Sequence, residues 1–523
     1  MIDLLLNNLN LVLEADGDAK RVRDAVLQLA VRGRLVAQNP EDEPALEAVR
    51  IARDKWFSGA STRERKNHSS DIDASEQWFE LPVSWCWSRI PWVTSGAGQQ
   101  APKKNFRYVD ISSIDGSEGA IDWAQVDEIS ATDAPSRARK NLARGSVIYS
   151  SVRPYQRKIA IFDTEDEGLF IASTGFQVLT ADDSLLAGFL WCWLRSDDFD
   201  DFAAIFAKGA AYPAINDRDF SKGLVPLPPL AEQHRIVAKV DELMDHASVL
   251  EERHQAASSA RVRLRDSALH ALAEAEDAEA VETAWQRIET HFEDLFTEPE
   301  DIQPLRQTIL QLAVRGRLVA QDPEDEGETL TLSEVGKWGA GRTPSRQKPH
   351  YFEGDVNWFK SGELPDGEMC DPSEEKISTI AIDECRMKVL EPGVVVIALY
   401  GATTGRVGIL RVAGTTNQAV LACTPNNRVV GEFLFLILKS LRDHFLGERA
   451  GGAQPNISKA KVVDVEIYLP PLAEQHRIVE KVDELMSLCD EVESRLEEAK
   501  QARERFASSV SAALVSEPAI QVA

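Results

Sequence analysis

The sequence predicts an α+β protein in which two globular mixed α/β domains are separated by two long antiparallel coiled-coil helices. Three observations indicate this architecture. Two stretches of sequence each occur twice, the segments between them are rich in glycine and short β-prone runs, and a long helical pattern follows each of those segments. The order helix, variable domain, long helix therefore occurs twice, which predicts an internal pseudo-two-fold duplication.

The repeated stretches are long and nearly unchanged. PPLAEQHRIVAKVDELM at residues 228–244 returns 242 positions later as PPLAEQHRIVEKVDELM at residues 470–486, and only Ala238 and Glu480 differ. A shorter stretch, LQLAVRGRLVAQ at residues 27–38, returns unchanged at residues 310–321. Matches of this length within one chain do not arise by chance, so they indicate a duplication.

Each copy of the longer repeat is expected to begin a helix directly after Pro-Pro, at Leu230 and at Leu472. The apolar residues that follow have the 4-3 spacing of a coiled-coil seam. They are Ile236, Val240, Leu243, Ala247 and Leu250 in the first copy, and Ile478, Val482, Leu485, Cys489, Val492 and Leu496 in the second. Each helix is expected to run for about forty residues, or roughly 60 Å. The shorter repeat is also expected to be helical, with Asn39-Pro40 and Asp322-Pro323 ending its two helices.

The repeats divide the chain into five expected segments. These are an N-terminal conserved helical segment (1–45), a first variable domain (80–226), a central conserved region (227–327), a second variable domain (328–468) and a C-terminal conserved long helix (469–523). Residues 58–77 have no counterpart in the second copy, and we expect a surface loop or a short extra helix there. The acidic, alanine-rich residues 271–284 are expected to form a solvated helix or linker between the halves.

Composition limits the class of protein. No stretch of about 18 uncharged apolar residues occurs, so no transmembrane helix is expected, and the N-terminus lacks the basic region of a signal peptide. Six cysteines without CxxC spacing indicate reduced thiols and a cytoplasmic protein. The net charge of -27 argues against nonspecific coating of nucleic acid, although it leaves room for local basic surfaces.

Motifs for catalysis are weak. The chain has no GxxxxGK(S/T) loop, no Asn/Asp-Pro-Pro-aromatic motif of the amino-methyltransferases, and no HExxH motif. Pro365-Asp366 followed by Glu374-Glu375-Lys376 imitates the PD…ExK pattern of nucleases, but it lies in a Gly/Pro-rich loop and has no counterpart in the first domain. We therefore expect no catalytic and no metal site in this chain.

Taken together, the repeated blocks resemble a known family. The duplicated LxLAVRGRLVxQ(N/D)PxDE block, two dissimilar domains and two LPPLAEQHRIVxKVDELM helices resemble the specificity (S) subunit of a type I restriction–modification system. Residues 336–364 also resemble the usual start of a target-recognition domain in that family. Residues 96–115 depart from it because they lack its TPS motif. The resemblance covers essentially the whole chain.

The resemblance implies a non-catalytic, sequence-specific DNA-binding subunit that acts in phage defence. Each variable domain would be a target-recognition domain for one half of a bipartite site in double-stranded DNA, mainly in the major groove. The long helices would hold the domains apart and dock two modification (methyltransferase) subunits. This chain would direct both those subunits and the restriction (translocase-nuclease) subunits to the DNA. This chain would hold no cofactor, since S-adenosylmethionine, ATP and Mg²⁺ would belong to those partner subunits.

In the first domain, residues 134–162 carry seven basic side chains and no acidic one, which suits a phosphate-facing surface in so acidic a chain. The basic residues are Arg137, Arg139, Lys140, Arg144, Arg153, Arg157 and Lys158. Tyr155 adds a group that can stack on bases or hydrogen-bond to them. Lys103, Lys104 and Arg107 form a second, weaker cluster. The alternative for residues 134–162 is a basic loop that is merely solvated.

In the second domain, arginines and small hydroxyl residues in a glycine-rich segment suit contacts to phosphates and base edges. The candidates are Arg342, Thr343, Ser345, Arg346, Lys348, Lys360 and Ser361 at its start, then Tyr400, Thr403, Thr404 and Arg406 opposite the first domain's basic segment. Gln454 and Asn456 are either amide readers of adenine or turn residues. For each residue, a structural role in a turn is an equal alternative.

Two other functions remain compatible with the sequence. One is a coiled-coil scaffold whose domains bind protein or sugar, which the basic segment disfavours. The other is a specificity chain of a related methylation-based phage-defence assembly. Neighbouring genes for a methyltransferase and a helicase-nuclease would distinguish a type I restriction–modification system from it.

Overall fold

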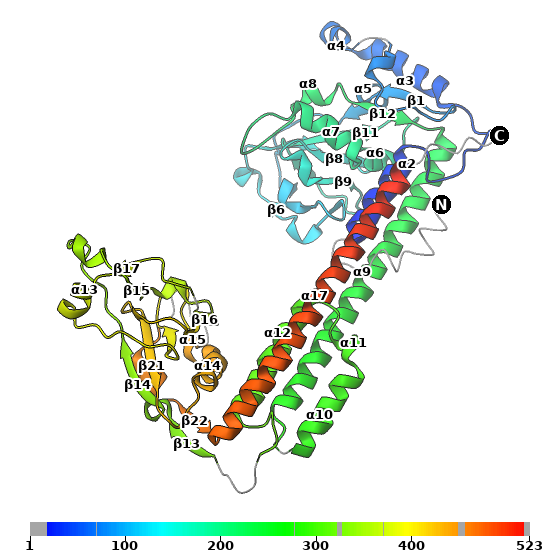
Figure 1. Ribbon diagram of the computed structural model, residues 1–523. Coiled ribbons are helices and arrows are strands. Elements are labelled where there is room, and N and C mark those ends of the chain that lie inside the picture. The colour runs from blue at the N-terminus through cyan, green and yellow to red at the C-terminus, as the bar shows by residue number, and fades with distance from the viewer. Residues whose placement is uncertain are drawn as a thin grey trace. The chain divides into compact units, whose positions relative to one another are not determined.

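The computed structural model describes residues 18–68, 71–276, 278–321, 327–369, 371–447 and 456–516. The chain forms two compact units, unit 1 of Met1–Ala256 with Ala502–Ala523, and unit 2 of Ala257–Gln501 (Figure 1). Each unit holds one variable domain and one copy of both repeats. Within the described ranges, no helix is long and apolar enough to cross a membrane.

Domain 1, the variable domain of unit 1, is closed by an antiparallel pair of strands at its two ends, β1 with β12. Between them lie a sheet of order β2-β11-β8-β9, a sheet of order β6-β3-β10-β7 and the small pair β4-β5. The strands are β1 (Cys86–Arg89), β2 (Thr94–Gly96), β3 (Phe106–Val109), β4 (Ile114–Asp115), β5 (Ala120–Ile121), β6 (Glu128–Ile129), β7 (Ala138–Asn141), β8 (Ser146–Ser150), β9 (Ile159–Phe162), β10 (Phe170–Ser173), β11 (Phe176–Ala181) and β12 (Leu224–Leu227). Its helices are α5 (Ile90–Val93), α6 (Ala187–Leu194), α7 (Asp197–Phe206) and α8 (Asp217–Phe220).

Domain 2, the variable domain of unit 2, repeats this plan. β13 pairs with β22 as β1 does with β12, and the sheet order β14-β21-β18-β19 matches β2-β11-β8-β9, with β16 added at one edge. The strands are β13 (Glu328–Thr331), β14 (Gly336–Ala340), β15 (Val356–Phe359), β16 (Glu368–Met369), β17 (Lys376–Ile377), β18 (Val395–Ala398), β19 (Val407–Leu410), β20 (Gly414–Thr416), β21 (Val420–Pro425) and β22 (Glu466–Leu469). The helices are α13 (Thr379–Glu384), α14 (Gly431–Ser440), α15 (Arg442–Leu446) and α16 (Lys459–Val463).

The second sheets of the two domains differ at one edge. The parallel pair β3–β10 of domain 1 corresponds to the parallel pair β15–β20 of domain 2. In domain 1 an additional strand, β7, pairs antiparallel with β10, whereas the corresponding sheet of domain 2 has the order β17-β15-β20. β7 carries part of the basic segment, so this segment is a strand as well as a loop. The predicted shared fold is present, with its main difference at a candidate binding surface.

The two long helices begin where the sequence predicts. α9 (Leu230–Ala273) has 44 residues and α17 (Leu472–Ser516) has 45. Each is fastened to its domain by a buried glutamine in the repeated motif. Gln233 accepts a hydrogen bond from the Leu186 N–H and donates to the carbonyls of Ser184 and Pro228. Gln475 makes the same three bonds in unit 2, with Val430, Arg428 and Pro470.

The shorter repeat forms α2 (Asp18–Val31) and α12 (Ile302–Val314). These helices end at a glycine with a left-handed backbone, Gly33 (φ +68°) or Gly316 (φ +66°). Bonds from Gly33 N–H to Ala30 O and from Arg34 N–H to Leu29 O form a Schellman motif, and the same pair recurs in the second copy. The predictions that Asn39-Pro40 ends the first helix and Asp322-Pro323 the second are therefore wrong, since α2 ends at Val31 and α12 at Val314. Residues 1–17 and Asp322-Pro323 themselves lie outside the described residues.

Each seam packs on the short helix of its own unit. Arg23 on α2 contacts Ser248 and Glu251, and Arg306 on α12 contacts Asp490 and Glu493. Asp490 and Glu493 lie 242 positions after Ser248 and Glu251, which is the offset of the longer repeat. Ile236, Val240 and Leu243 share the core of unit 1 with α2. Ile478, Val482 and Cys489 share the core of unit 2 with α12. The duplication thus extends to individual contacts.

Unit 2 contains the last part of α9 and the first part of α17, and these two parts run in opposite directions beside α12 (Figure 1). At the start of α12, Asp301 binds Arg261 of α9 at 2.5 Å, and Glu300 binds Lys500 of α17 at 3.1 Å. At its end, Arg315 donates to Ala273 O at 2.7 Å, and Gly316 lies against Glu474. From the start to the end of α12, the contacting residue numbers therefore increase along α9, from 261 to 273, and decrease along α17, from 500 to 474. This confirms the predicted antiparallel arrangement within the unit.

Two connecting segments of the chain contain helices. The segment before domain 1 forms α3 (Ala45–Gly59) and the expected short helix α4 (Thr62–Asn67), and Val49 and Ala52 of α3 are buried in the core of unit 1. The acidic segment 271–284, expected to be a solvated helix or linker, is helical in two parts. α9 ends at Ala273, and α10 (Ala278–Thr290) begins a separate helix whose Val281 and Ala284 pack against the core of unit 2 rather than being fully solvated. A short helix, α11 (Phe292–Leu295), then leads into α12.

Candidate nucleic-acid interface

Backbone hydrogen bonds join four loops of domain 1 into one surface. Gln100 N–H donates to Arg139 O at 2.8 Å, and Thr174 N–H donates to Arg137 O at 2.8 Å. Ser151 N–H then reaches Gly175 O, and Arg153 N–H reaches Pro213 O at 2.7 Å. The surface carries four of the predicted DNA-binding residues, which are Arg137, Arg139, Arg153 and Tyr155. The side chain of Lys140 is only 13% exposed and pairs with Asp217 at 3.8 Å, so its predicted role as a DNA contact is corrected to that of an ion-pair partner within the domain. Lys103 and Lys104 are exposed on the segment that follows Gln100.

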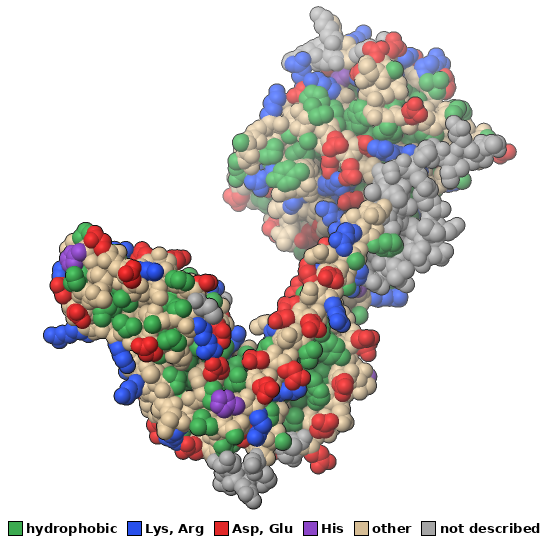
Figure 2. All heavy atoms as spheres, in the orientation of Figure 1, with side chains coloured by type: hydrophobic (Ala, Val, Ile, Leu, Met, Phe, Trp, Pro, Cys, Tyr) green, Lys and Arg blue, Asp and Glu red, His purple; other side chains and the backbone are tan. Residues whose placement is uncertain are grey.

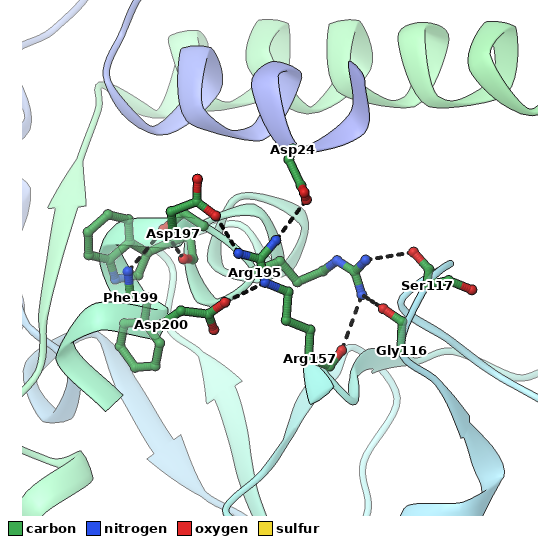
Figure 3. A network of polar contacts seen from close by, with 10 residues as sticks. Asp24, Gly116, Ser117, Arg157, Arg195, Asp197, Phe199 and Asp200 are labelled. Atoms are coloured by element: carbon green, nitrogen blue, oxygen red, sulfur yellow. Dashed lines mark hydrogen bonds and ion pairs between the residues drawn. The ribbon is translucent and has the colours of Figure 1, made fainter. Parts of the chain in front are cut away.

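Two predicted contacts, Arg157 and Lys158, have other partners inside the protein. The Arg157 guanidinium binds Asp24 of α2 at 2.7 Å and also binds Asp197 and Asp200 of α7 (Figure 3). Lys158 donates to Ile111 O at 2.9 Å. Because their charges and donors are already used within domain 1 and on α2, the prediction that these side chains face phosphate is corrected. They hold the loop that carries Arg153 and Tyr155.

A second arginine, Arg195, binds the backbone of the same loop. Arg195, at the end of α6, donates to the carbonyls of Gly116, Ser117 and Arg157 (Figure 3). Burial, with the nearby charge of Arg157, lowers the pKa of Arg195 to about 10. Burial also raises the pKa of Asp200 to about 6, against the opposing effect of Arg157. The loop is therefore fixed by a partly desolvated set of charges, whose balance depends on Arg157.

Two further arginines of domain 1 are compensated by the acidic loop after β9. Arg107 lies 2.5 Å from Asp166 and over the Phe170 ring, and Arg144 lies 2.6 Å from Asp163. The side chains of both pairs are between 35% and 64% exposed, so they contribute little to stability. Their positive charge is nevertheless offset at this place, which leaves the Arg137–Tyr155 surface as the stronger candidate.

Tyr212 belongs to this surface but was not among the predicted residues. The Arg153 guanidinium lies over its ring at 4.4 Å from the centroid. Tyr212 and Tyr155 are large exposed aromatics, with exposed fractions of 68% and 64%. Exposed aromatic side chains beside arginines suit stacking on bases. The sequence signal was present in KGAAYPAI at residues 208–215, but only the fold brings it to Arg153.

In domain 2, the start of the domain lies against the loop before β21. Arg342 N–H donates to Thr416 O at 3.0 Å, and the Thr343 hydroxyl binds the Gln418 side chain. The Thr403 hydroxyl donates to Ser361 O at 2.7 Å, and Ile457 N–H donates to Leu399 O. Asn417 N–H donates to Phe359 O at 3.0 Å, so the loop that contacts Arg342 and Thr343 is also bonded to the strand that leads to Ser361 and its partner Thr403. Gln418, which the sequence reasoning missed, belongs to that loop.

The remaining predicted residues of domain 2 vary in their surroundings. Arg346 binds Glu375 and lies over the Phe352 ring, Lys348 binds Glu384, and Lys360 binds Glu374. The Ser345 hydroxyl accepts a bond from Gln347 N–H, Tyr400 is partly buried at the core of unit 2, and Arg406 makes a long contact to Leu364 O. Thr404 is buried and donates to Gly401 O, so its predicted role as a DNA contact is corrected to that of a turn residue. Asn456 is exposed, and Gln454 lies outside the described residues.

The carboxylates of the nuclease-like pattern are engaged by other groups of domain 2. Asp366 accepts hydrogen bonds from Val407 N–H and Arg442, each at 2.9 Å, and the two glutamates of the pattern bind Lys360 and Arg346. Each carboxylate therefore has a cationic partner within the domain. Among the described residues, no group of three or more His, Cys, Asp or Glu side chains could hold a metal ion.

Acidic side chains gather on the helices of the repeats. Figure 2 shows Asp and Glu along the exposed face of α17 in unit 2, where Glu480, Asp483, Glu484, Asp490 and Glu491 are exposed. The candidate surfaces of the two domains, by contrast, present arginine, lysine, tyrosine and hydroxyl groups. This distribution reconciles the net charge of -27 with local basic surfaces.

One fold present twice, with a different polar surface on each copy and a shared helical support, defines a recognition subunit with two distinct binding domains. The family model for the type I restriction modification DNA specificity domain matches residues 91–257 and 324–501. The chain therefore belongs to the family of type I restriction–modification specificity subunits, and it determines the DNA sequence on which such a system acts.

Individual relatives agree with this assignment. The chain is similar to the type I restriction enzyme EcoEI specificity subunit of Escherichia coli, with 26% identity over 555 residues that cover 94% of this chain and 93% of the relative. It is 25% identical over 566 residues to the EcoAI specificity subunit of Escherichia coli, covering 95% and 94%. A solved chain from "Structural basis underlying complex assembly and conformational transition of the type I R-M system" is 28% identical, with a TM-score of 0.54, and the match covers 84% of this chain and 99% of that one.

Proposed function

We propose that the chain recognises a bipartite site in double-stranded DNA, with domain 1 binding one half and domain 2 the other. The observation that carries this proposal is the contrast between a shared fold and different loop surfaces. Domain 1 presents Arg137, Arg153 and Tyr155, whereas domain 2 presents Arg342, Thr343 and Thr403. Two copies of one fold with different contact groups suit two different half-sequences.

The chain itself carries no chemistry in this proposal. The carboxylates that resemble a nuclease motif are engaged in ion pairs, as described for Asp366. S-adenosylmethionine, ATP and Mg²⁺ belong in this proposal to the methyltransferase and restriction subunits of the type I system. The five described cysteines are free thiols, which fits a cytoplasmic protein that works on cellular and invading DNA.

Two modification subunits dock, one on each copy of the repeat. The support is a duplicated exposed patch at the start of the long helices. Leu230 and Leu472 are each 43% exposed, and His234 and His476 are exposed one turn further on. Because the two patches have the same sequence, each offers the same contacts to a copy of the same partner.

Leu230→Glu and Leu472→Glu test the stoichiometry. With the modification subunit in excess, each single variant is expected to bind one copy and the double variant none, as measured by native mass spectrometry. Leu264→Glu is the matched control, since Leu264 is also exposed on α9 but lies outside the repeat. Two bound copies in both single variants would contradict this docking site.

The recognition function is tested by the methylation pattern of cells that express the complete system. Replacement of domain 1 by the corresponding domain of a relative is expected to change one half of the methylated motif and leave the other half unchanged. A change in both halves would refute the assignment of one half-site to each domain.

A further inference from the structure

Domain 1 has arginine at two backbone positions where domain 2 has glycine. Arg153 (φ 50°, ψ 58°) and Arg157 (φ 48°, ψ 37°) flank a short turn and are both left-handed. Gly401 and Gly405, each 248 positions later, have φ of 101° and 81°. The same turn hydrogen bond, from Gln156 N–H to Arg153 O and from Thr404 N–H to Gly401 O, confirms that the positions correspond.

This conformation is costly for any residue other than glycine, so each arginine needs a reason to be there. Arg157 has one, because it binds three carboxylates. Arg153 forms no ion pair with the described residues. Its Nε is buried without a hydrogen-bond partner there, and its guanidinium lies over Tyr212. The strain at Arg153 is therefore not explained by stability.

The loop that holds Tyr212 is built to present it. Lys208 and Ala214 close the loop with two backbone bonds of 3.0 and 2.9 Å. Between them, Gly209 has φ of 112°, and a Cβ there would meet Tyr212 O at 2.8 Å. The exposed loop tip consists of small residues and one tyrosine, so the Tyr212 ring is its main contact group and at the same time the support for Arg153.

A guanidinium stacked on an aromatic ring keeps its planar set of donors in a fixed orientation. Such a set matches O6 and N7 of guanine in the major groove, which accept two parallel hydrogen bonds. A phosphate contact would require neither the strained backbone nor the stacked ring, since phosphate oxygens accept hydrogen bonds from many directions and a flexible lysine also binds them as a point charge.

We propose that Arg153, held in place by Tyr212, is the specificity-determining residue of domain 1 and that it recognises a guanine in the half-site of this domain. Tyr212 is a positioning residue that acts through Arg153. This inference rests on the proposed function of domain 1 as the reader of one half-site. It also predicts that domain 2, with Gly401 at the corresponding position, recognises its own half-site by other residues.

The test uses Arg153→Gly in the full chain assembled with its modification subunits. Because domain 2 has glycine in the same turn, this variant is expected to fold, and a cooperative thermal transition within a few degrees of that of the wild type checks that it does. Binding is measured by competition among duplexes that differ at one base pair at a time. The wild type is expected to prefer guanine at one position of one half-site by about 10- to 100-fold, and the variant is expected to lose that preference alone.

Four further measurements, three on variants and one on a modified duplex, separate this role from others. Arg153→Lys keeps the charge and is expected to lose the preference, Tyr212→Ala to weaken it, and Tyr212→Phe to retain it. A duplex with 7-deazaguanine at the chosen position lacks the N7 acceptor and should bind more weakly to the wild type but not to Arg153→Gly.

The outcomes also separate this inference from the proposed function. A uniform loss of affinity for all sequences with a smaller salt dependence would show a phosphate contact and overturn the inference, as would an unchanged preference or a lost preference for another base. A wild type without any sequence preference would instead refute the proposed function.

Discussion

Arg157→Gly should destabilise unit 1 although it removes a strained backbone conformation. Removal of one partner from a buried ion pair costs about 3–5 kcal/mol. The Arg157 side chain is 17% exposed, but Asp197 is 59% exposed, so we expect the lower end of this range, about 3 kcal/mol. Arg153→Gly is the matched control because it makes the same change at a second left-handed position. It loses only a cation–π contact of about 1 kcal/mol.

The relief of strain and the added freedom of the unfolded chain are common to both variants, so they cancel in the comparison. Arg157→Gly should therefore be less stable than Arg153→Gly by about 2 kcal/mol, which corresponds to a melting temperature lower by roughly 4–8 °C for a unit of this size. Hydrogen exchange followed by mass spectrometry should show faster exchange in α2 and in residues 152–158 of Arg157→Gly. Equal melting temperatures and equal exchange in the two variants would refute the structural role of Arg157.

The difference between the two variants should also depend on pH. Burial raises the pKa of Asp200 to about 6 and also raises that of Asp24, while Arg157 opposes both shifts. A carboxyl group whose folded pKa is raised contributes stability below its unfolded pKa, near 3.8, and loses that contribution as pH rises through the folded value. Without Arg157 both folded values rise further, so the deficit of Arg157→Gly should grow from pH 5 to pH 8. A deficit that is constant over this range would contradict the assignment.

The other predictions concern the repeat and the nuclease-like motif. Gln233→Ala leaves the Leu186 N–H and two carbonyls without their buried partner, so it should destabilise unit 1 by about 2–4 kcal/mol in urea unfolding, and Gln475→Ala should do the same to unit 2. Gln286→Ala, which removes only an exposed contact to Glu282, should change stability by less than about 0.5 kcal/mol, and an equal effect at Gln233 would contradict its role as a fastening residue. Glu374→Gln should leave DNA cleavage by the assembled system unchanged, since this carboxylate binds Lys360. Loss of cleavage with normal methylation would instead support a nuclease function for domain 2.

The helix starts were predictable because their signals are local. Pro-Pro followed by a 4-3 apolar spacing indicates α9 and α17 directly, and both begin at the predicted leucine. The end of α2 was mispredicted because two signals compete there. Asn39-Pro40 is a plausible stop, but the left-handed Gly33 and its Schellman bonds end the helix earlier.

The candidate interface was predictable only as a segment. The basic run of residues 134–162 identified the right part of domain 1, but not which of its side chains are free. Arg157 is neutralised by Asp24, Asp197 and Asp200, which lie between 40 and 133 positions away in the sequence. Tyr212 was missed for the same reason, since its contact with Arg153 exists only after folding. The sequence shows where basic residues lie along the chain. Which of those residues are neutralised by an acidic partner depends on tertiary contacts, which the sequence does not show.

The central claim is that sequence recognition is divided between two domains on a duplicated support. The most direct test is the methylome of a strain that carries the complete system, before and after replacement of residues 91–227 by the matching residues of a relative with a known motif. The account predicts a hybrid motif in which one half comes from the relative and the other half is unchanged. A motif that stays unchanged, or that changes in both halves, would contradict it.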